Sequence, residues 1–284
     1  MSLRVDTVDQ AALPAITPAA DVVVPLDDDL RPSRRSARPS QRRGSVPRPE
    51  PLERDAPASQ ARVTRAYERR QTTFMGLELE VGPGALVPRA ETELLGEVAL
   101  DTLRGLSPGR SPRLIDMCCG SGNLACALGA HAAGALIWAS DLTDGAVAVA
   151  RRNVIRLGLE ATVHVAQGDL FASFEGLGLE GSIDLITCNP PYISTHRLEN
   201  ERSTLLLQEP REAFDGGPYG LSIHQRVVSE AQAFLRPGGV LLFEIGQRQE
   251  RQVELLLRRA RAYGEVEMRR DGAGQVRVVF ARRL

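Results

Sequence analysis

The chain of 284 residues contains no lysine, so all 35 of its basic residues are arginines. Because alanine and glycine are also abundant, this absence indicates a coding bias rather than a functional demand for guanidinium groups. Acidic and basic residues nearly balance, and the formal net charge at pH 7 is −1. A protein whose whole surface binds nucleic acid is therefore not expected, although local basic patches remain open.

Cysteine is also scarce, and its placement excludes the common cysteine-based sites. The sequence has neither two separated Cys-x-x-Cys pairs nor an accompanying histidine cluster, so we expect no zinc site or other metal centre. Two adjacent cysteines cannot easily bridge one another, which favours small, buried, reduced thiols and a cytoplasmic protein. The four cysteines are Cys118, Cys119, Cys126 and Cys188.

Long apolar runs are missing as well. Near the N-terminus, the short apolar run from Val22 to Val24 is followed by Pro25 and three consecutive aspartates. This stretch is too short for a signal peptide, and no other segment is long and apolar enough to span a bilayer. We therefore expect no association with a membrane.

The chain divides by composition into three parts. Residues 1–60 are rich in proline, serine and charge, with seven arginines and no acid from Arg31 to Arg48, and they are predicted to be a disordered tail. The basic run could tether RNA or an acidic partner, but a solvated tail is the favoured interpretation. Residues 61–90 are predicted to form a short helix and an entry segment. Residues 91–284 are predicted to form one catalytic domain.

Apolar runs alternate with amphipathic stretches throughout the predicted catalytic domain. This alternation is typical of an α/β fold with a doubly wound, mostly parallel sheet, and the end of the chain has the pattern of a β-hairpin. Asp144 is expected to cap a helix. We predict strands at residues 114–117, 135–140, 162–166, 183–188 and 240–245, helices at 92–103, 144–157, 222–235 and 249–263, and hairpin strands at 265–270 and 275–282.

A glycine turn after the first of these strands predicts a nucleotide-like ligand. Gly120 and Gly122 would let the backbone approach a ligand closely, and a helix that begins near Ser121 would offer its unpaired N–H groups. The next strand ends in Asp141, about 20 residues later, the spacing at which a carboxylate meets both ribose hydroxyls. The third glycine of the dinucleotide fingerprint is replaced by Ala125, so a nicotinamide enzyme is disfavoured. S-adenosylmethionine is the predicted ligand.

The four residues Asn189 to Tyr192 form a receptor for a planar NH2 group. An amide nitrogen is a poor nucleophile because its lone pair is delocalised. Asn189 offers a side-chain carbonyl, and Pro190 offers a backbone carbonyl fixed by the following Pro191, so two acceptors could hold two hydrogens. Tyr192 adds an aromatic face for stacking. The motif predicts methyl transfer to nitrogen with Asn189, Pro190 and Tyr192 as catalytic residues, whereas the alternative is a turn that only ends a strand.

From about Phe74 to its C-terminus, the chain resembles the HemK-type protein-glutamine N5-methyltransferases, which modify the Gly-Gly-Gln loop of peptide-chain release factors. The Pro-Arg-x-Glu-Thr-Glu block is more specific than the glycine turn, which many methyltransferases share. The motifs that carry the resemblance are Leu86 to Leu94, the glycine turn, Gly168 to Phe171, Asn189 to Tyr192, Glu209 to Arg211 with Asp215 to Gly217, and Phe243 to Gly246.

The resemblance implies a class I S-adenosylmethionine-dependent methyltransferase fold, with a seven-stranded sheet that ends in an antiparallel hairpin. It also implies two sets of site residues, and the carboxylate of Asp169 is expected to accept the adenine amino group. The cofactor-binding residues expected are Cys118, Gly120, Gly122, Asp141, Asp169, Leu170 and Asn189. The substrate-binding residues expected are Asn189, Pro190, Pro191, Tyr192, Arg89 and Glu91.

The sequence departs from the family pattern in ways that keep the methyl acceptor open. Family members begin with a compact helical domain that grips the release factor, and residues 1–60 show no such pattern. The alternatives are an exocyclic amino group of RNA or DNA, reached by base flipping, the amide of a small metabolite, or a non-catalytic cofactor-binding module.

Three further side chains carry expectations of their own. Arg89 is expected to pair with Glu91, with Glu93 or with the substrate backbone. Glu244 and Gln247, near the end of the last predicted parallel strand, could line the site, but a solvated strand end is the favoured interpretation for both.

Overall fold

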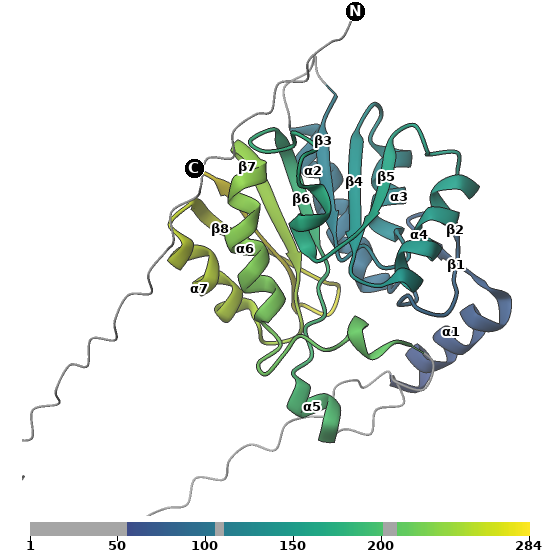
Figure 1. The fold of residues 1–284 in the computed structure, drawn as a ribbon. Helices are drawn as coiled ribbons and strands as arrows, with labels where there is room; N and C mark the ends of the chain where they lie inside the picture. Colours follow the sequence, from purple (N-terminus) through teal and green to yellow (C-terminus); the bar gives the residue numbers. More distant parts are fainter. Residues whose placement is uncertain (1–55, 106–110, 201–208) are drawn as a thin grey trace, which may run out of the picture. The chain divides into compact units, whose positions relative to one another are not determined.

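The computed structural model describes residues 56–105, 111–200 and 209–284 (Figure 1). The predicted disordered tail lies outside these residues up to position 55, but helix α1 (Ala56–Arg69) begins ahead of the expected boundary at residue 61. A small antiparallel hairpin follows, made of β1 (Gln71–Phe74) and β2 (Leu77–Glu80), which the sequence analysis did not predict. Each strand has only four residues, too few for a clear alternating pattern.

The main sheet has seven strands in the order β5-β4-β3-β6-β7-β9-β8. Strands β5, β4, β3, β6 and β7 pair in parallel, and β9 and β8 complete the sheet as an antiparallel hairpin. This topology confirms the predicted fold class. The strands are β3 (Arg113–Met117), β4 (Leu136–Asp141), β5 (Val163–Gln167), β6 (Ile183–Cys188), β7 (Leu235–Glu244), β8 (Tyr263–Arg270) and β9 (Val276–Arg283).

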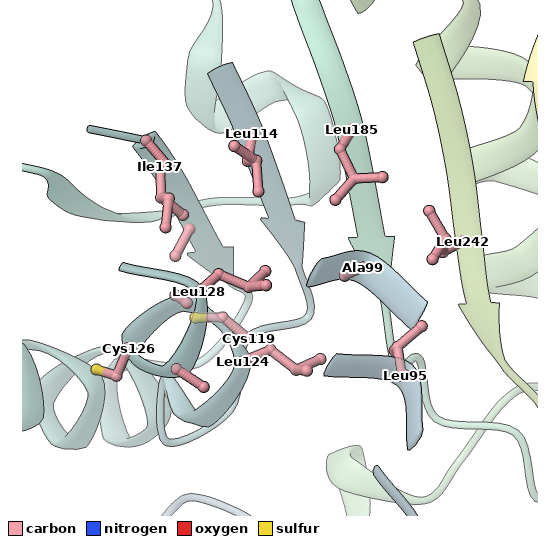
Figure 2. Packing of buried hydrophobic residues seen from close by; sticks show 14 of the residues in the cluster. Leu95, Ala99, Leu114, Cys119, Leu124, Cys126, Leu128, Ile137, Leu185 and Leu242 are labelled. Carbon is pink, nitrogen blue, oxygen red and sulfur yellow. The ribbon is translucent and has the colours of Figure 1, made fainter. Parts of the chain in front are cut away.

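Helices cover both faces of this sheet because alternate residues of its strands are apolar on each side. On one face, Leu114, Leu185 and Leu242 pack against α2 (Glu93–Arg104) and α3 (Asn123–His131), as Figure 2 shows. The neighbouring residues Ile115, Ile186 and Leu241 point the other way into a second core. That core includes buried residues of α6 (Ser222–Phe234) and α7 (Glu250–Ala260).

Two boundaries differ from the sequence prediction for local physical reasons. Helix α4 (Asp144–Arg156) is capped by Thr143 rather than by Asp144, since the Thr143 hydroxyl accepts from the backbone N–H of Ala146 at 3.3 Å. Strand β7 begins at Leu235, ahead of the Pro-Gly-Gly segment expected to separate helix and strand. Leu235 pairs with Ile183, and the pairing register then shifts, which accommodates this segment.

The strand order reverses at β3, which lies between β4 and β6. In open α/β sheets, ligands bind beyond the carboxyl ends of the strands at such a reversal, because the loops there diverge to opposite faces. The glycine turn and the Asn189 motif follow strands at this edge, and Asp141 is the last residue of β4. Within the described residues, no helix is both long and apolar enough to cross a bilayer.

Candidate functional site

A cavity opens at this edge, with an empty volume of about 1000 Å³ that includes space open to solvent. Eight of the predicted site residues line it, and four others (Gly122, Pro190, Tyr192 and Glu91) are not among the described lining residues. The eight are Arg89, Cys118, Gly120, Asp141, Asp169, Leu170, Asn189 and Pro191.

The glycine turn forms one wall of the cavity. Cys118 and Gly120 both have left-handed backbones, with φ of 57° and 54°. A Cβ added at Gly120 would meet no atom of the described residues within 4 Å, so the space beside this residue is open to a ligand. Gly122 acts differently, because a Cβ there would lie 3.0 Å from the Cβ of Ala150. Gly122 thus permits close packing of α3 on α4, and α3 begins at Asn123 rather than near Ser121.

The carboxylate of Asp141 joins the ends of β3 and β4 at the cavity. Its Oδ2 accepts from the backbone N–H of Gly120 at 2.9 Å, and its Oδ1 accepts from the backbone N–H of Thr143 at 3.2 Å. These bonds fix the carboxylate while leaving lone pairs for further donors, since an ionised carboxylate has about four acceptor sites. The geometry suits recognition of a diol.

Two features beside Asp141 were missed by the sequence analysis. Leu142 lines the cavity although its surface is 60% exposed, and an apolar side chain in that position suits the flat face of a ligand ring. The carboxylate of Asp169 is held by Arg226 of α6, whose Nη1 lies 2.8 and 3.0 Å from its two oxygens. Leu142 could have been predicted to line the site because it is an apolar residue that directly follows the acid at the end of a strand.

The segment before α2 forms the opposite wall and is clamped by Glu209. Oε1 of Glu209 accepts from the backbone N–H of Val87 at 2.8 Å, and Oε2 pairs with Nη2 of Arg89 at 2.5 Å. The expected pairing of Arg89 with Glu91 or Glu93 is therefore wrong. Glu91 is exposed, and Glu93 accepts from the backbone N–H of Met75.

Replacing Arg89 by methionine is expected to lower the free energy of unfolding by roughly 3 kcal/mol, because the carboxylate of Glu209 would stay buried without its partner. The side chain of Glu209 is only 1% exposed. Urea denaturation at pH 7 measures the change. The double variant Arg89→Met with Glu209→Gln should recover most of the loss, since the amide oxygen can still accept from Val87. Equal stability of the single and double variants would contradict the clamp.

Asn189 is oriented by its neighbours so that its carbonyl is free. Its Nδ2 donates to the hydroxyl of Thr92 at 3.2 Å. Within the described residues, no hydrogen bond reaches its Oδ1 or the backbone carbonyl of Pro190. Two acceptors of the predicted NH2 receptor are thus without partners, although Pro190 itself is buried.

Backbone contacts shape the loop that carries this motif. A Cβ added at Gly216 would lie 2.6 Å from the carbonyl oxygen of Pro191, and one added at Gly220 would lie 2.3 Å from that of Tyr192. Ile193 also exchanges backbone hydrogen bonds with Phe214 and Gly216. Gly216 of the Asp-Gly-Gly motif and Gly220 therefore support the Asn189 motif by close backbone packing, which only glycine allows.

Behind the motif lies a polar cluster of four residues, of which all but the half-buried Tyr192 are buried: Thr92, Tyr192, Glu244 and Arg277. The expectation that Glu244 lies at a solvated strand end is wrong, because this residue is 1% exposed. Burial raises the pKa of Glu244 to about 7, against the lowering effects of Arg277 and Thr92. Burial and the Glu244 carboxylate raise the pKa of Tyr192 to about 12, against a lowering effect of Arg277. The Tyr192 hydroxyl therefore belongs to this cluster.

His224 of α6 lies next to the cluster and is fully buried, and its Nε2 lies 3.4 Å from the Glu244 carbonyl. Burial lowers its pKa from 6.5 to about 4. The unfolded chain therefore binds a proton more readily than the folded protein does. The stability that neutral His224 contributes is present above pH 6.5 and is lost as the pH falls towards 4.

Between pH 7 and pH 4, the wild-type protein is expected to lose about 3 kcal/mol more unfolding free energy than the His224→Phe variant. The variant has no titrating group at this position, so subtracting its profile removes the contributions of all other groups. Urea denaturation over this pH range gives both profiles. Parallel profiles would mean that His224 is protonated in the folded protein.

Known proteins resemble the chain over most of its length. The family model described as "Methyltransferase small domain" matches residues 96–218. A curated relative from Moorella thermoacetica, named "Release factor glutamine methyltransferase", is 36% identical over 80% of this chain and 82% of its own length. A relative of the same name from Gloeobacter violaceus is 36% identical, over 72% of this chain and 68% of its own.

Solved structures share the fold at lower sequence identity. A methyltransferase from Pyrococcus furiosus is 18% identical with a TM-score of 0.52, and the match covers 79% of this chain and 98% of that one. The human methyltransferase 10 domain containing protein is 17% identical with a TM-score of 0.56, and the match covers 80% of this chain and 96% of that protein's chain. At these identities the likeness supports the fold and nothing finer.

Proposed function

The chain belongs to the family of the release factor glutamine methyltransferases, and we propose that it methylates the side-chain nitrogen of a glutamine in a peptide-chain release factor. The observation that carries this proposal is a pair of acceptors, Asn189 Oδ1 and the Pro190 carbonyl, which have no hydrogen-bond partner among the described residues and lie beside the cavity. A planar carboxamide has two hydrogens to give to them. The resemblance of the motifs to the family supports the Gly-Gly-Gln loop as the proposed site of the acceptor.

The cavity fits S-adenosylmethionine as the methyl donor. Asp141 presents an anchored carboxylate for the ribose hydroxyls, and Leu142 offers an apolar surface for the adenine. The open space beside Gly120 leaves room for close approach to the backbone. Asp169 is the expected acceptor for the adenine amino group, with Arg226 holding its carboxylate in place. The bound cofactor would supply a methyl group on a positively charged sulfur.

The protein's own contribution is placement of the acceptor nitrogen. Asn189 Oδ1 and the Pro190 carbonyl would hold its two hydrogens, and this would direct its lone pair towards the methyl group. Alignment of two reactants supplies roughly 7 to 11 kcal/mol of barrier reduction. The same two acceptors would stabilise the N–H groups as they become more polar, because their dipoles are already oriented. The nitrogen proton becomes acidic once the methyl group is bound, so a strong general base is not required.

The proposal is tested by incubating the purified protein with tritiated S-adenosylmethionine and a release factor. A matched reaction contains the same factor with the glutamine of its Gly-Gly-Gln loop replaced. Label on the first factor alone is the expected result. Label on both factors, or on neither while the cofactor binds, would overturn the glutamine assignment and direct the search to nucleic acids and metabolite amides.

A further inference from the structure

We infer that Tyr219 is a specificity-determining residue, whose ring packs against the main chain of the release factor beside the acceptor glutamine. The inference rests on the proposed function, because it names a contact between that factor and the rim of the same site. Tyr219 has the most exposed large apolar side chain of the described residues, at 85%. Within those residues, no hydrogen bond or ring contact engages it. Because single exposed apolar residues are common, the position of Tyr219 carries the argument.

A β-turn holds the backbone that carries this side chain. The backbone N–H of Gly220 donates to the carbonyl of Gly217 at 3.1 Å, so Pro218 and Tyr219 are the two central residues of the turn. Proline at the first central position stiffens the turn because its ring fixes φ. Tyr219 is not among the described residues with a positive φ, so other residues fit the same backbone. A ring on a stiff turn loses little entropy when it meets a partner.

The same turn is tied to the loop that holds the acceptor motif. A Cβ added at Gly220 would lie 2.3 Å from the carbonyl oxygen of Tyr192, so the two backbones are in direct contact. Nε2 of Gln249 donates to that carbonyl at 3.0 Å and to the carbonyl of Gly220 at 3.2 Å. One side chain therefore joins the turn to the end of the Asn189 motif.

Tyr219 stands at the rim of the cavity on its acceptor side. Ala213 before the turn and Ile223 after it both line the cavity, whereas Tyr219 does not. A glutamine side chain is short, so a glutamine that reaches Asn189 brings its own main chain to this rim. In the proposed Gly-Gly-Gln loop, the residues before the glutamine are glycines, which leave their peptide planes uncovered. The flat apolar face of a tyrosine ring suits such planes.

The charges around the turn favour a protein over a nucleic acid as the partner. From Glu209 to Gly220 the chain has three acids and one cation, Arg211. That guanidinium is already paired, with Asp215 at 3.2 Å and with Glu199 at 3.7 Å. A phosphate backbone needs arginine or lysine to neutralise it, and this stretch offers only acids beyond the paired arginine. A loop of glycines carries no charge and needs no such partner.

Steady-state methylation of the release factor by variants at position 219 tests this contact. We expect Tyr219→Ala to raise the KM for the factor roughly ten-fold and to leave kcat within about three-fold of wild type, because the contact is the same before and during methyl transfer. Tyr219→Phe keeps the ring and should keep the KM within about three-fold. Ile155→Ala is the matched control, since Ile155 is 62% exposed on α4 and does not line the cavity. It should change neither constant.

Calorimetric titration with the release factor measures the same contact without methyl transfer, when the cofactor is replaced by S-adenosylhomocysteine, which has no methyl group to give. The dissociation constant should rise for Tyr219→Ala by the same factor as the KM. Equal KM values for Tyr219→Ala and the wild type would overturn the inference while leaving the proposed function intact. Weaker binding of a single-stranded RNA alone would overturn it in favour of a nucleic acid. If the wild-type protein does not methylate the factor, the proposed function fails and the inference with it.

Discussion

Replacing Asn189 by alanine is expected to lower the rate of methyl transfer by roughly 100- to 1000-fold, the range found when one preorganised polar group is removed from an active site. The variant loses the side-chain oxygen that would hold one hydrogen of the acceptor nitrogen. Single-turnover experiments at saturating cofactor measure this rate without interference from product release. No other single change described for this site is expected to have a larger effect on the chemical step.

Cofactor binding provides the control for the Asn189→Ala variant. Asn189 lines the cavity, but Asp141, the glycine turn and Leu142 lie on its other walls and are unchanged. Calorimetric titration should therefore give a dissociation constant within about three-fold of the wild-type value. Turnover close to that of the wild type would contradict the assignment of Asn189 as the residue that holds the acceptor nitrogen. A large loss of cofactor affinity would move its role from the acceptor to the cofactor.

Gly120→Ala is expected to weaken cofactor binding by ten-fold or more, roughly the effect of 1 to 3 kcal/mol of steric conflict. The added methyl group would occupy the space beside the glycine turn, which no described residue fills. The left-handed backbone of Gly120 adds strain of about 1 to 2 kcal/mol for any residue with a Cβ. Calorimetric titration with S-adenosylmethionine measures the affinity, and urea denaturation measures the strain.

Gly158→Ala separates these two contributions. Gly158 also has a left-handed backbone, with φ of 67°, and a Cβ there would meet no atom of the described residues within 4 Å. It does not line the cavity. Both variants should lose similar stability, and only Gly120→Ala should lose affinity. If the two bound the cofactor equally well, the ligand could not approach the turn as proposed.

The sequence predicted the sheet well because its central strands β3 and β6 are buried along nearly their whole length. Strand β6 was predicted with its observed bounds, Ile183–Cys188, because all six of its residues are buried. Its two polar residues, Asp184 and Thr187, form hydrogen bonds within the protein. The hairpin of β1 and β2 escaped prediction because its strands are short and partly exposed. Continuous burial leaves a clear pattern, and half-exposed short strands do not.

The site was predicted in its parts but not in its connections. Asn189 and Asp141 could be identified because their residue types and strand-end positions point to their chemistry. The partners of Arg89 and Asn189 could not, because Glu209 and Thr92 are distant in the sequence and meet them only when the sheet brings its edges together. The burial of Glu244 was missed for the same reason. Its partner, Arg277, lies on the final strand of the chain.

The clamp by Glu209 also has a consequence for synthesis of the protein. Val87 and Arg89 can be clamped only after Glu209 has been synthesised, 120 residues after Arg89. At translation rates of 5 to 20 residues per second, synthesis of that stretch takes roughly 6 to 24 s. The glycine turn and Asp141 are synthesised within that interval, when the nascent chain still has only part of the cavity wall. Ligand binding stabilises only states that can bind, so the cofactor would begin to protect the chain from proteolysis after the clamp is made.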